Sequence, residues 1–115
     1  MKTIKELNLD SNQKRAINEL KNVLHQIWPI KKIIIFGSTA RGEATPDSDI
    51  DVLVITEKEL THKQRGEMTA RAFDIDNKFQ TCISLVIIDE KTWYGPSSFT
   101  TLFSDIEKDG VIVDE

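Results

Sequence analysis

Two acidic residues interrupt the apolar pattern of the segment "DIDVLVI", residues 49–55. Asp49 and Asp51 are two positions apart, and residues two apart on a strand point to the same face of a sheet. Neighbouring carboxylates repel each other and resist joint ionisation unless a cation lies between them. Mg²⁺ often binds one or two carboxylates together with substrate phosphates. The pair therefore predicts a metal site, although acids at a solvated strand end are the alternative.

The segment "GSTARG", residues 37–42, precedes this strand and offers groups that bind phosphate. Gly37 lets the backbone approach a ligand closely, and Ser38 adds a hydroxyl beside exposed N–H groups. Arg41 can bind phosphate through its planar guanidinium, or it can form a structural salt bridge. Ser38 can also cap a short helix. A phosphate-binding turn beside a metal site is the combination that phosphoryl or nucleotidyl transfer requires.

The elements that position these residues follow from the apolar periodicity. We expect helices from Asp10 or Ser11 to about Ile27, over 58–79 and over 98–109. Short apolar runs predict strands over 32–36, 49–55 and 82–88, with a short final strand at "VIV" and a loop at "DEKTWYGPSS". Helices that alternate with short strands indicate an α/β or α+β fold with one sheet.

Composition restricts the class of protein. The 115 residues suit one domain, residues 1–115. The net charge is −4 with scattered Lys and Arg, which argues against tight binding to nucleic acid without help. Cys82, the single cysteine, cannot form an internal disulfide and fits a cytoplasmic location. We find no secretory leader and no apolar stretch near 18 residues, so we expect no membrane span.

The ordered segment "GSTARGEATPDSDIDVLV" resembles the signature of the minimal nucleotidyltransferases, in the DNA polymerase beta superfamily. The positions that match the signature are Gly37, Ser38, Arg41, Gly42, Ser48, Asp49 and Asp51. The resemblance implies a single small domain with a short mixed sheet flanked by helices. It also implies transfer of a nucleoside monophosphate, with AMP expected, from an NTP such as ATP to a hydroxyl acceptor.

The resemblance also implies roles for individual residues. Asp49 and Asp51 would be the catalytic metal ligands of a two-ion Mg²⁺ site, which Mn²⁺ could also occupy. Gly37 and Ser38 would hold the β- and γ-phosphates. Arg41 would support the turn or contact phosphate, and Ser48, also placed in the nucleotide-binding group, would brace or cap the loop. Small domains of this family often pair with a helical HEPN-type protein in toxin–antitoxin arrangements.

One expected residue is missing from the pattern. Active members normally carry a third carboxylate on the next core strand, and Ser84 occupies the matching position in "CISLVII". Asp89 has the wrong parity to replace it. A serine is neutral and a poor base, so its presence would slow transfer. The alternative function is therefore a catalytically weak nucleotide-binding or antitoxin module that acts by binding a HEPN-type partner.

Five other side chains attract attention but receive structural interpretations. His25 and His62 are expected at the surface, and Cys82 is expected to be a buried, inert thiol. Trp93 and Tyr94 are expected to pack a loop against the core rather than to line a base pocket.

Overall fold

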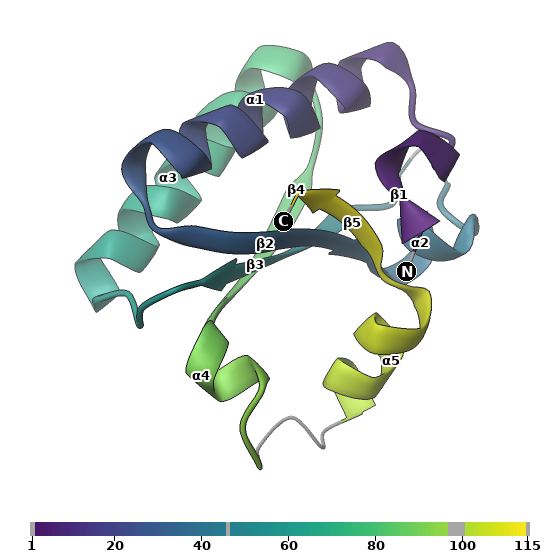
Figure 1. Ribbon diagram of the computed structural model, residues 1–115. Helices are drawn as coiled ribbons and strands as arrows, with labels where there is room; N and C mark the ends of the chain where they lie inside the picture. Colours follow the sequence, from purple (N-terminus) through teal and green to yellow (C-terminus); the bar gives the residue numbers. More distant parts are fainter. Residues whose placement is uncertain (1, 46, 97–100, 115) are drawn as a thin grey trace.

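The computed structural model describes residues 2–45, 47–96 and 101–114 (Figure 1). Two helical layers enclose a mixed five-stranded sheet. In chain order the elements are β1 (Lys2–Thr3), η1 (Ile4–Glu6), α1 (Ser11–Ile27), β2 (Ile30–Phe36), α2 (Gly37–Arg41), β3 (Ile50–Thr56), α3 (His62–Phe79), β4 (Ile83–Asp89), α4 (Glu90–Trp93), α5 (Thr101–Asp109) and β5 (Val111–Asp114).

The strands lie in the order β1-β5-β2-β3-β4. β2 pairs antiparallel with β3 and with β5, whereas β3 and β4 are parallel, as are β1 and β5. The register places Phe36 opposite Asp51, and Asp51 opposite Ser84. The end of β2 and the beginnings of β3 and β4 are therefore aligned at one end of the sheet.

The two faces of the sheet carry separate apolar clusters. α1 and α3 cover one face, where Ile50, Val52 and Val54 of β3 are buried with the helices. α4 and α5 lie on the other side, where Leu53 and Ile55 pack with Trp93, Phe103 and Ile106. Because side chains alternate along a strand, Asp51 belongs to the α4/α5 face.

Local signals explain most of the element bounds. Asp10 accepts a hydrogen bond from the Gln13 backbone at 2.8 Å, which starts α1 where the sequence predicted. Thr61 caps α3 in the same way, so this helix begins at His62 rather than at Lys58. The spacing of Met68, Ala72, Ile75 and Phe79 predicts one apolar face for α3. The first three are buried, and Phe79 packs partly buried against the same cluster.

Two expectations about the C-terminal part need correction or fall outside the described residues. The segment predicted as a loop after β4 contains the short helix α4, because the Asp89 carboxylate accepts a hydrogen bond from the Thr92 backbone at 3.0 Å. The predicted start of the last helix at Ser98 lies outside the described residues, and α5 is described from Thr101. The predicted final strand is confirmed as β5.

None of the helices in the part of the chain that the structure describes is both long enough and apolar enough to cross a membrane.

Asp76 connects the end of α3 to the start of β4. Its carboxylate accepts hydrogen bonds from the Ile83 backbone at 3.0 and 3.1 Å and from the Thr81 hydroxyl at 2.8 Å. Both contacts are partly buried. Asp76 therefore fixes the first residue of the strand that carries Ser84.

We expect Asp76→Ala to lower the free energy of unfolding by about 1–3 kcal/mol, since it leaves the Ile83 N–H without its partner. Urea denaturation followed by circular dichroism measures this loss. Asp74→Ala is the matched control, because Asp74 lies on the same helix and is exposed. Equal losses in the two variants would contradict the bracing role of Asp76.

Candidate active site

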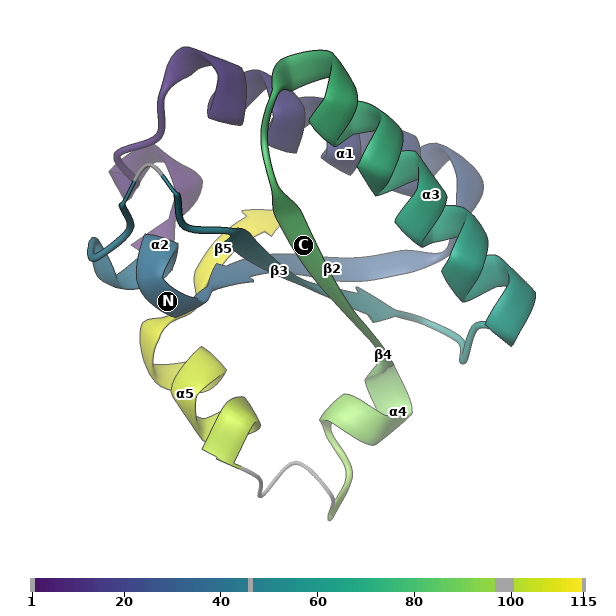
Figure 2. The ribbon, with the colours of Figure 1, turned by 180° about the vertical axis from the view of Figure 1, so that it is seen from behind.

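Gly37 and Asp51 are in direct contact where β2 ends and β3 begins. Gly37 follows Phe36, the residue opposite Asp51, and it has a positive φ of 73°. A Cβ atom built on Gly37 would overlap the Oδ2 atom of Asp51. The Asp51 carboxylate therefore occupies the space that any other residue's side chain would fill. Figure 2 shows α2 and the start of β3 side by side at this end of the sheet.

Asp49 lies one residue before β3 and is exposed, whereas Asp51 is half-buried. The pKa of Asp51 is raised above its usual range because its partly buried position disfavours the charged form. The nearby Asp49 charge raises this pKa further, and the Arg41 guanidinium opposes both effects. The two carboxylates predicted to act together are thus electrostatically coupled, and the ionised pair lacks full compensation from the protein.

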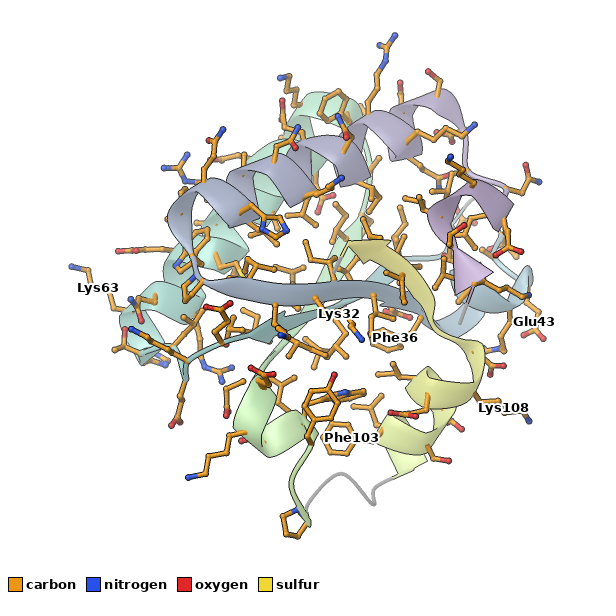
Figure 3. The ribbon with its side chains drawn as sticks, in the orientation of Figure 1. Lys32, Phe36, Glu43, Lys63, Phe103 and Lys108 are labelled. Carbon is orange, nitrogen blue, oxygen red and sulfur yellow. The ribbon has the colours of Figure 1, made fainter. Side chains whose placement is uncertain are left out.

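Arg41 ends α2 and forms an ion pair with Glu43, with Nε and Oε2 3.0 Å apart. The hydrogen bond to Glu43 raises the pKa of Arg41, and the charges of Asp109 and Asp105 on α5 add to it. Arg41 also lines a cavity of about 490 Å³ with Lys108 and Asp109. Glu43 and Lys108 lie at the same end of the molecule in Figure 3. Of the two roles considered for Arg41, this conformation contains the salt bridge.

The two serines of the predicted nucleotide-binding group occupy different settings. Ser38 is the second residue of α2, and Phe36 is the N-cap, so the expectation that Ser38 caps this helix is wrong. Ser48 accepts a hydrogen bond from the Thr45 backbone at 3.0 Å, and its hydroxyl lies 3.1 Å from that of Thr45. The Ser48 side chain therefore braces the loop that leads into β3.

Ser84 is exposed on β4, an edge strand of the sheet, and it lies beside Asp51 of the neighbouring strand β3. Asp89 is at the opposite end of β4, paired with Thr56, and Asp76 is hydrogen-bonded to the backbone of Ile83. Within residues 2–45, 47–96 and 101–114, no three side chains of His, Cys, Asp or Glu are grouped so that they could hold a metal ion. Asp49 and Asp51 are thus not joined by a third such side chain among these residues.

Cys82 was expected to be buried and is instead exposed, next to Asp49. A hydrogen bond to Asp49 is the main cause that raises the pKa of the Cys82 thiol, with smaller contributions from burial and from the charges of Asp49 and Asp76. The error arose because Cys82 precedes β4 rather than lying within it. Aligning Asp51 with Ser84 would have located the contact, since it also aligns Asp49 with Cys82.

The remaining candidates are structural or at the surface. His25 and His62 are exposed, as expected. Trp93 is buried and makes an edge-to-face contact with Phe103, with ring centroids 4.6 Å apart. Tyr94 is 58% exposed and does not pack as predicted. Lys32 and Phe36 lie on the same side of the sheet as Phe103 (Figure 3), the side to which Asp51 belongs.

We expect Gly37→Ala to lower the free energy of unfolding by about 1–3 kcal/mol, since alanine would be strained at this φ and would displace the Asp51 carboxylate. Gly42→Ala is the matched control. Gly42 has nearly the same φ, 74°, but a Cβ there would meet nothing within 4 Å. Thermal or urea unfolding of both variants separates strain from overlap, and a larger loss for Gly42→Ala would contradict the contact.

We expect Asp51→Asn to raise the melting temperature at neutral pH in buffer without divalent cations. Because folding raises the pKa of Asp51, the protonated form is favoured in the folded state. This stabilisation is complete below the unfolded pKa of about 3.9 and is lost as pH rises through the folded pKa. The gain from Asn should therefore shrink towards about pH 4. Asp47→Asn, in the exposed loop, is the control, and a lower melting temperature for Asp51→Asn at neutral pH would contradict this account.

Comparison with known proteins gives consistent matches. A family model described as "Nucleotidyltransferase domain" matches residues 17–112. A relative in Methanocaldococcus jannaschii, named "Putative protein adenylyltransferase MJ0141", is 30% identical over 99 residues, which cover 84% of this chain and 94% of the relative. Another, "Putative protein adenylyltransferase MJ0604", is 50% identical over 46 residues. This second match spans 38% of this chain and about half, 46%, of the relative.

Solved structures agree on the fold. A crystal structure of a putative nucleotidyltransferase from Sulfolobus solfataricus matches with a TM-score of 0.56 at 25% identity, covering 88% of this chain and 81% of that one. A tri-AMPylated Shewanella oneidensis HEPN toxin in complex with MNT antitoxin matches with a TM-score of 0.52 at 18% identity, covering 86% of this chain and 69% of that one. The predicted α+β fold and the resemblance are thus confirmed, and the chain belongs to the nucleotidyltransferase domain family of enzymes.

Proposed function

We propose that this chain transfers AMP from ATP to a hydroxyl group on a partner protein, with the site built around Asp49 and Asp51. The observation that carries the proposal is the contact between the Gly37 turn and the Asp51 carboxylate. This contact brings a close-approach backbone turn and a pair of coupled acids to one place. A triphosphate could therefore lie on the turn while its oxygens approach the acids.

The acids fit a magnesium ion that is shared with the nucleotide. Two carboxylates plus substrate phosphates are a common ligand set for Mg²⁺. The pKa of Asp51 is raised by burial and by the Asp49 charge, which Arg41 offsets only in part, and a divalent cation would supply the remaining positive charge. Asp49 and Asp51 would hold the ion, and its chemistry there is to neutralise phosphate charge and polarise the α-phosphate. The same reasoning extends to Mn²⁺ and to a second ion.

The chain's own residues would position the substrate. The N–H groups and hydroxyl of Gly37 and Ser38 would donate to the β- and γ-phosphates, and Ser48 would keep the loop before Asp49 in place. Arg41 would leave Glu43 and turn to a phosphate, because both side chains are exposed and exposed ion pairs are weak. Positioning of this kind supplies most of the catalysis in phosphoryl transfer.

The reaction would be a substitution at the α-phosphorus. The acceptor oxygen forms a bond to this phosphorus while the bond to the β-phosphate oxygen breaks, and pyrophosphate leaves with the electron pair. The acceptor hydroxyl loses its proton in the process. A neutral hydroxyl stands at Ser84, beside Asp51, where a third carboxylate would act as the base, so the proton would pass to solvent and transfer would be slow.

Ser84 also favours a second candidate, a nucleotide-binding antitoxin module that acts mainly by contact. A site with two acids can retain metal and nucleotide while it loses most of its rate. Under either function we propose a HEPN-type helical protein as the partner. The support is the fold shared with the MNT antitoxin, which was solved in complex with a tri-AMPylated HEPN toxin.

The test is incubation of the protein with α-labelled ATP, Mg²⁺ and a candidate HEPN partner. We expect slow labelling of the partner that is lost in Asp49→Asn and after removal of divalent cations. We expect Ser84→Asp to increase the rate by about 10²-fold or more, because it adds a base beside Asp51. Because Ser84 is exposed, the substitution leaves the apolar core unchanged.

The outcomes separate the two functions. Labelled nucleotide that binds to the wild type without transfer, followed by transfer in Ser84→Asp, would favour the binding module. An absence of both binding and transfer in the wild type and in Ser84→Asp would refute the proposed site. Ser104→Asp on α5 is a matched control, since this serine is also exposed and lies on a different element.

A further inference from the structure

A groove of about 410 Å³ lies between η1, the first half of α1 and β5, away from the proposed transfer site. Its floor is apolar and its rim is basic. The residues that line it are Ile4, Lys5, Leu7, Lys14, Ile17, Asn18, Lys21 and Val113.

The floor keeps apolar surface in contact with solvent. Ile17 is buried in the core, but Ile4, Leu7 and Val113 pack against that core and stay only half-buried. A contiguous apolar strip of this kind can be covered by a side chain from another molecule. The groove therefore offers anchoring positions that the chain itself does not fill in its described part.

Three lysines form the rim. Lys14 and Lys21 are seven residues apart on α1, so they lie on one stripe of the helix, with Asn18 between them. Lys5 enters from η1 on the other side of the groove. Among the side chains that the structure describes, which exclude that of residue 114, none forms a salt bridge to these lysines.

The nearest acids along η1 and α1 have other partners. Glu6 accepts a hydrogen bond from the Thr3 backbone at 2.8 Å, and Asp10 caps α1 through Gln13. Glu19 pairs with Lys78 of α3 at 2.8 Å. The residues that line the groove thus include three lysines and no acid, in a chain whose net charge is −4.

We propose that this groove binds an acidic segment of a partner protein that carries large apolar side chains. The lysines on the rim favour a segment with acidic side chains, because opposite charges attract. The half-buried apolar floor favours large apolar side chains on the same segment. Lys5, Lys14 and Asn18 are exposed, so the walls are open to solvent and admit a continuous polypeptide.

The groove and the Asp51 carboxylate lie on opposite faces of the sheet, while η1 extends from the groove to α2, where Glu6 lines a cavity with Ala40 and Arg41. Ile17 and Val113 belong to the cluster on the α1/α3 face, whereas Asp51 belongs to the opposite face. A partner held in the groove would leave the Gly37–Asp51 contact uncovered. The groove would therefore act as a docking surface that raises the local concentration of a partner without blocking nucleotide.

The test is fluorescence anisotropy with a fluorescein-labelled peptide, Glu-Glu-Leu-Leu-Asp-Glu-Leu-Leu-Glu, and the full chain. We expect saturable binding that weakens as salt is added, because the rim charges are solvent-exposed. The double variant Lys14→Glu/Lys21→Glu should weaken binding by about ten-fold or more, since attraction becomes repulsion. The double variant Lys14→Gln/Lys21→Gln, which only removes the charges, should bind the peptide with an intermediate affinity. It keeps the test valid if the glutamate variant fails to fold.

Two matched controls isolate the groove. Lys63→Glu/Lys91→Glu makes the same change in net charge on α3 and α4, and Lys63 points away from the groove side in Figure 3. It should bind the peptide like the wild type. A peptide with serine in place of leucine should bind more weakly. No binding of the leucine peptide, equal binding by all variants, or equal binding of the serine peptide would each overturn the proposal. Concentration-dependent dimers that the lysine variants abolish, with no peptide binding, would assign the groove to a second copy instead.

Discussion

The contact between the Gly37 backbone and the Asp51 carboxylate is the constraint on which the site depends. It requires a residue without a side chain at the end of β2 and an acid two residues after Asp49, in the register that pairs Phe36 with Asp51. If the β2–β3 pairing shifted by one residue, the acid would move to the other face of the sheet. Side chains of β3 alternate between the two apolar clusters, and this alternation therefore also determines the face on which Asp51 lies.

The site is held in an electrostatically unfavourable state by the rest of the fold. Burial and the Asp49 charge both disfavour ionised Asp51, and Arg41 compensates only in part. The free energy for this arrangement comes from the apolar residues of the same strand, Val52 to Ile55, which are fully buried. The buried apolar residues of β3 thus hold the acids at its beginning in place, although the two carboxylates repel each other.

The sequence alone predicted the layered α+β fold, the face of α3 and the central strands, since these depend on periodicity and on apolar runs. It also predicted that the turn at Gly37 and the acid Asp51 would lie close together. It missed α4, because a four-residue helix has too little periodicity to detect. It misplaced Cys82, because one residue decides whether a side chain lies in a strand or before it. The sequence left the role of Arg41 open between phosphate and a salt bridge, and it did not predict the bracing role of Asp76, because apolar periodicity does not report short-range polar contacts such as Arg41–Glu43 and Asp76–Ile83.

The strand order carries a consequence for how the chain reaches this fold. β2 lies between β3, its near neighbour in sequence, and β5, which is more than seventy residues further along. During synthesis, β2 can pair with β3 early, but its other edge, with Ile33, Ile34 and Ile35, stays without a partner until residues 111–114 emerge. An unpaired apolar edge is a template for association with other chains. β5 thus closes an apolar edge that would otherwise be open to association in the nascent protein.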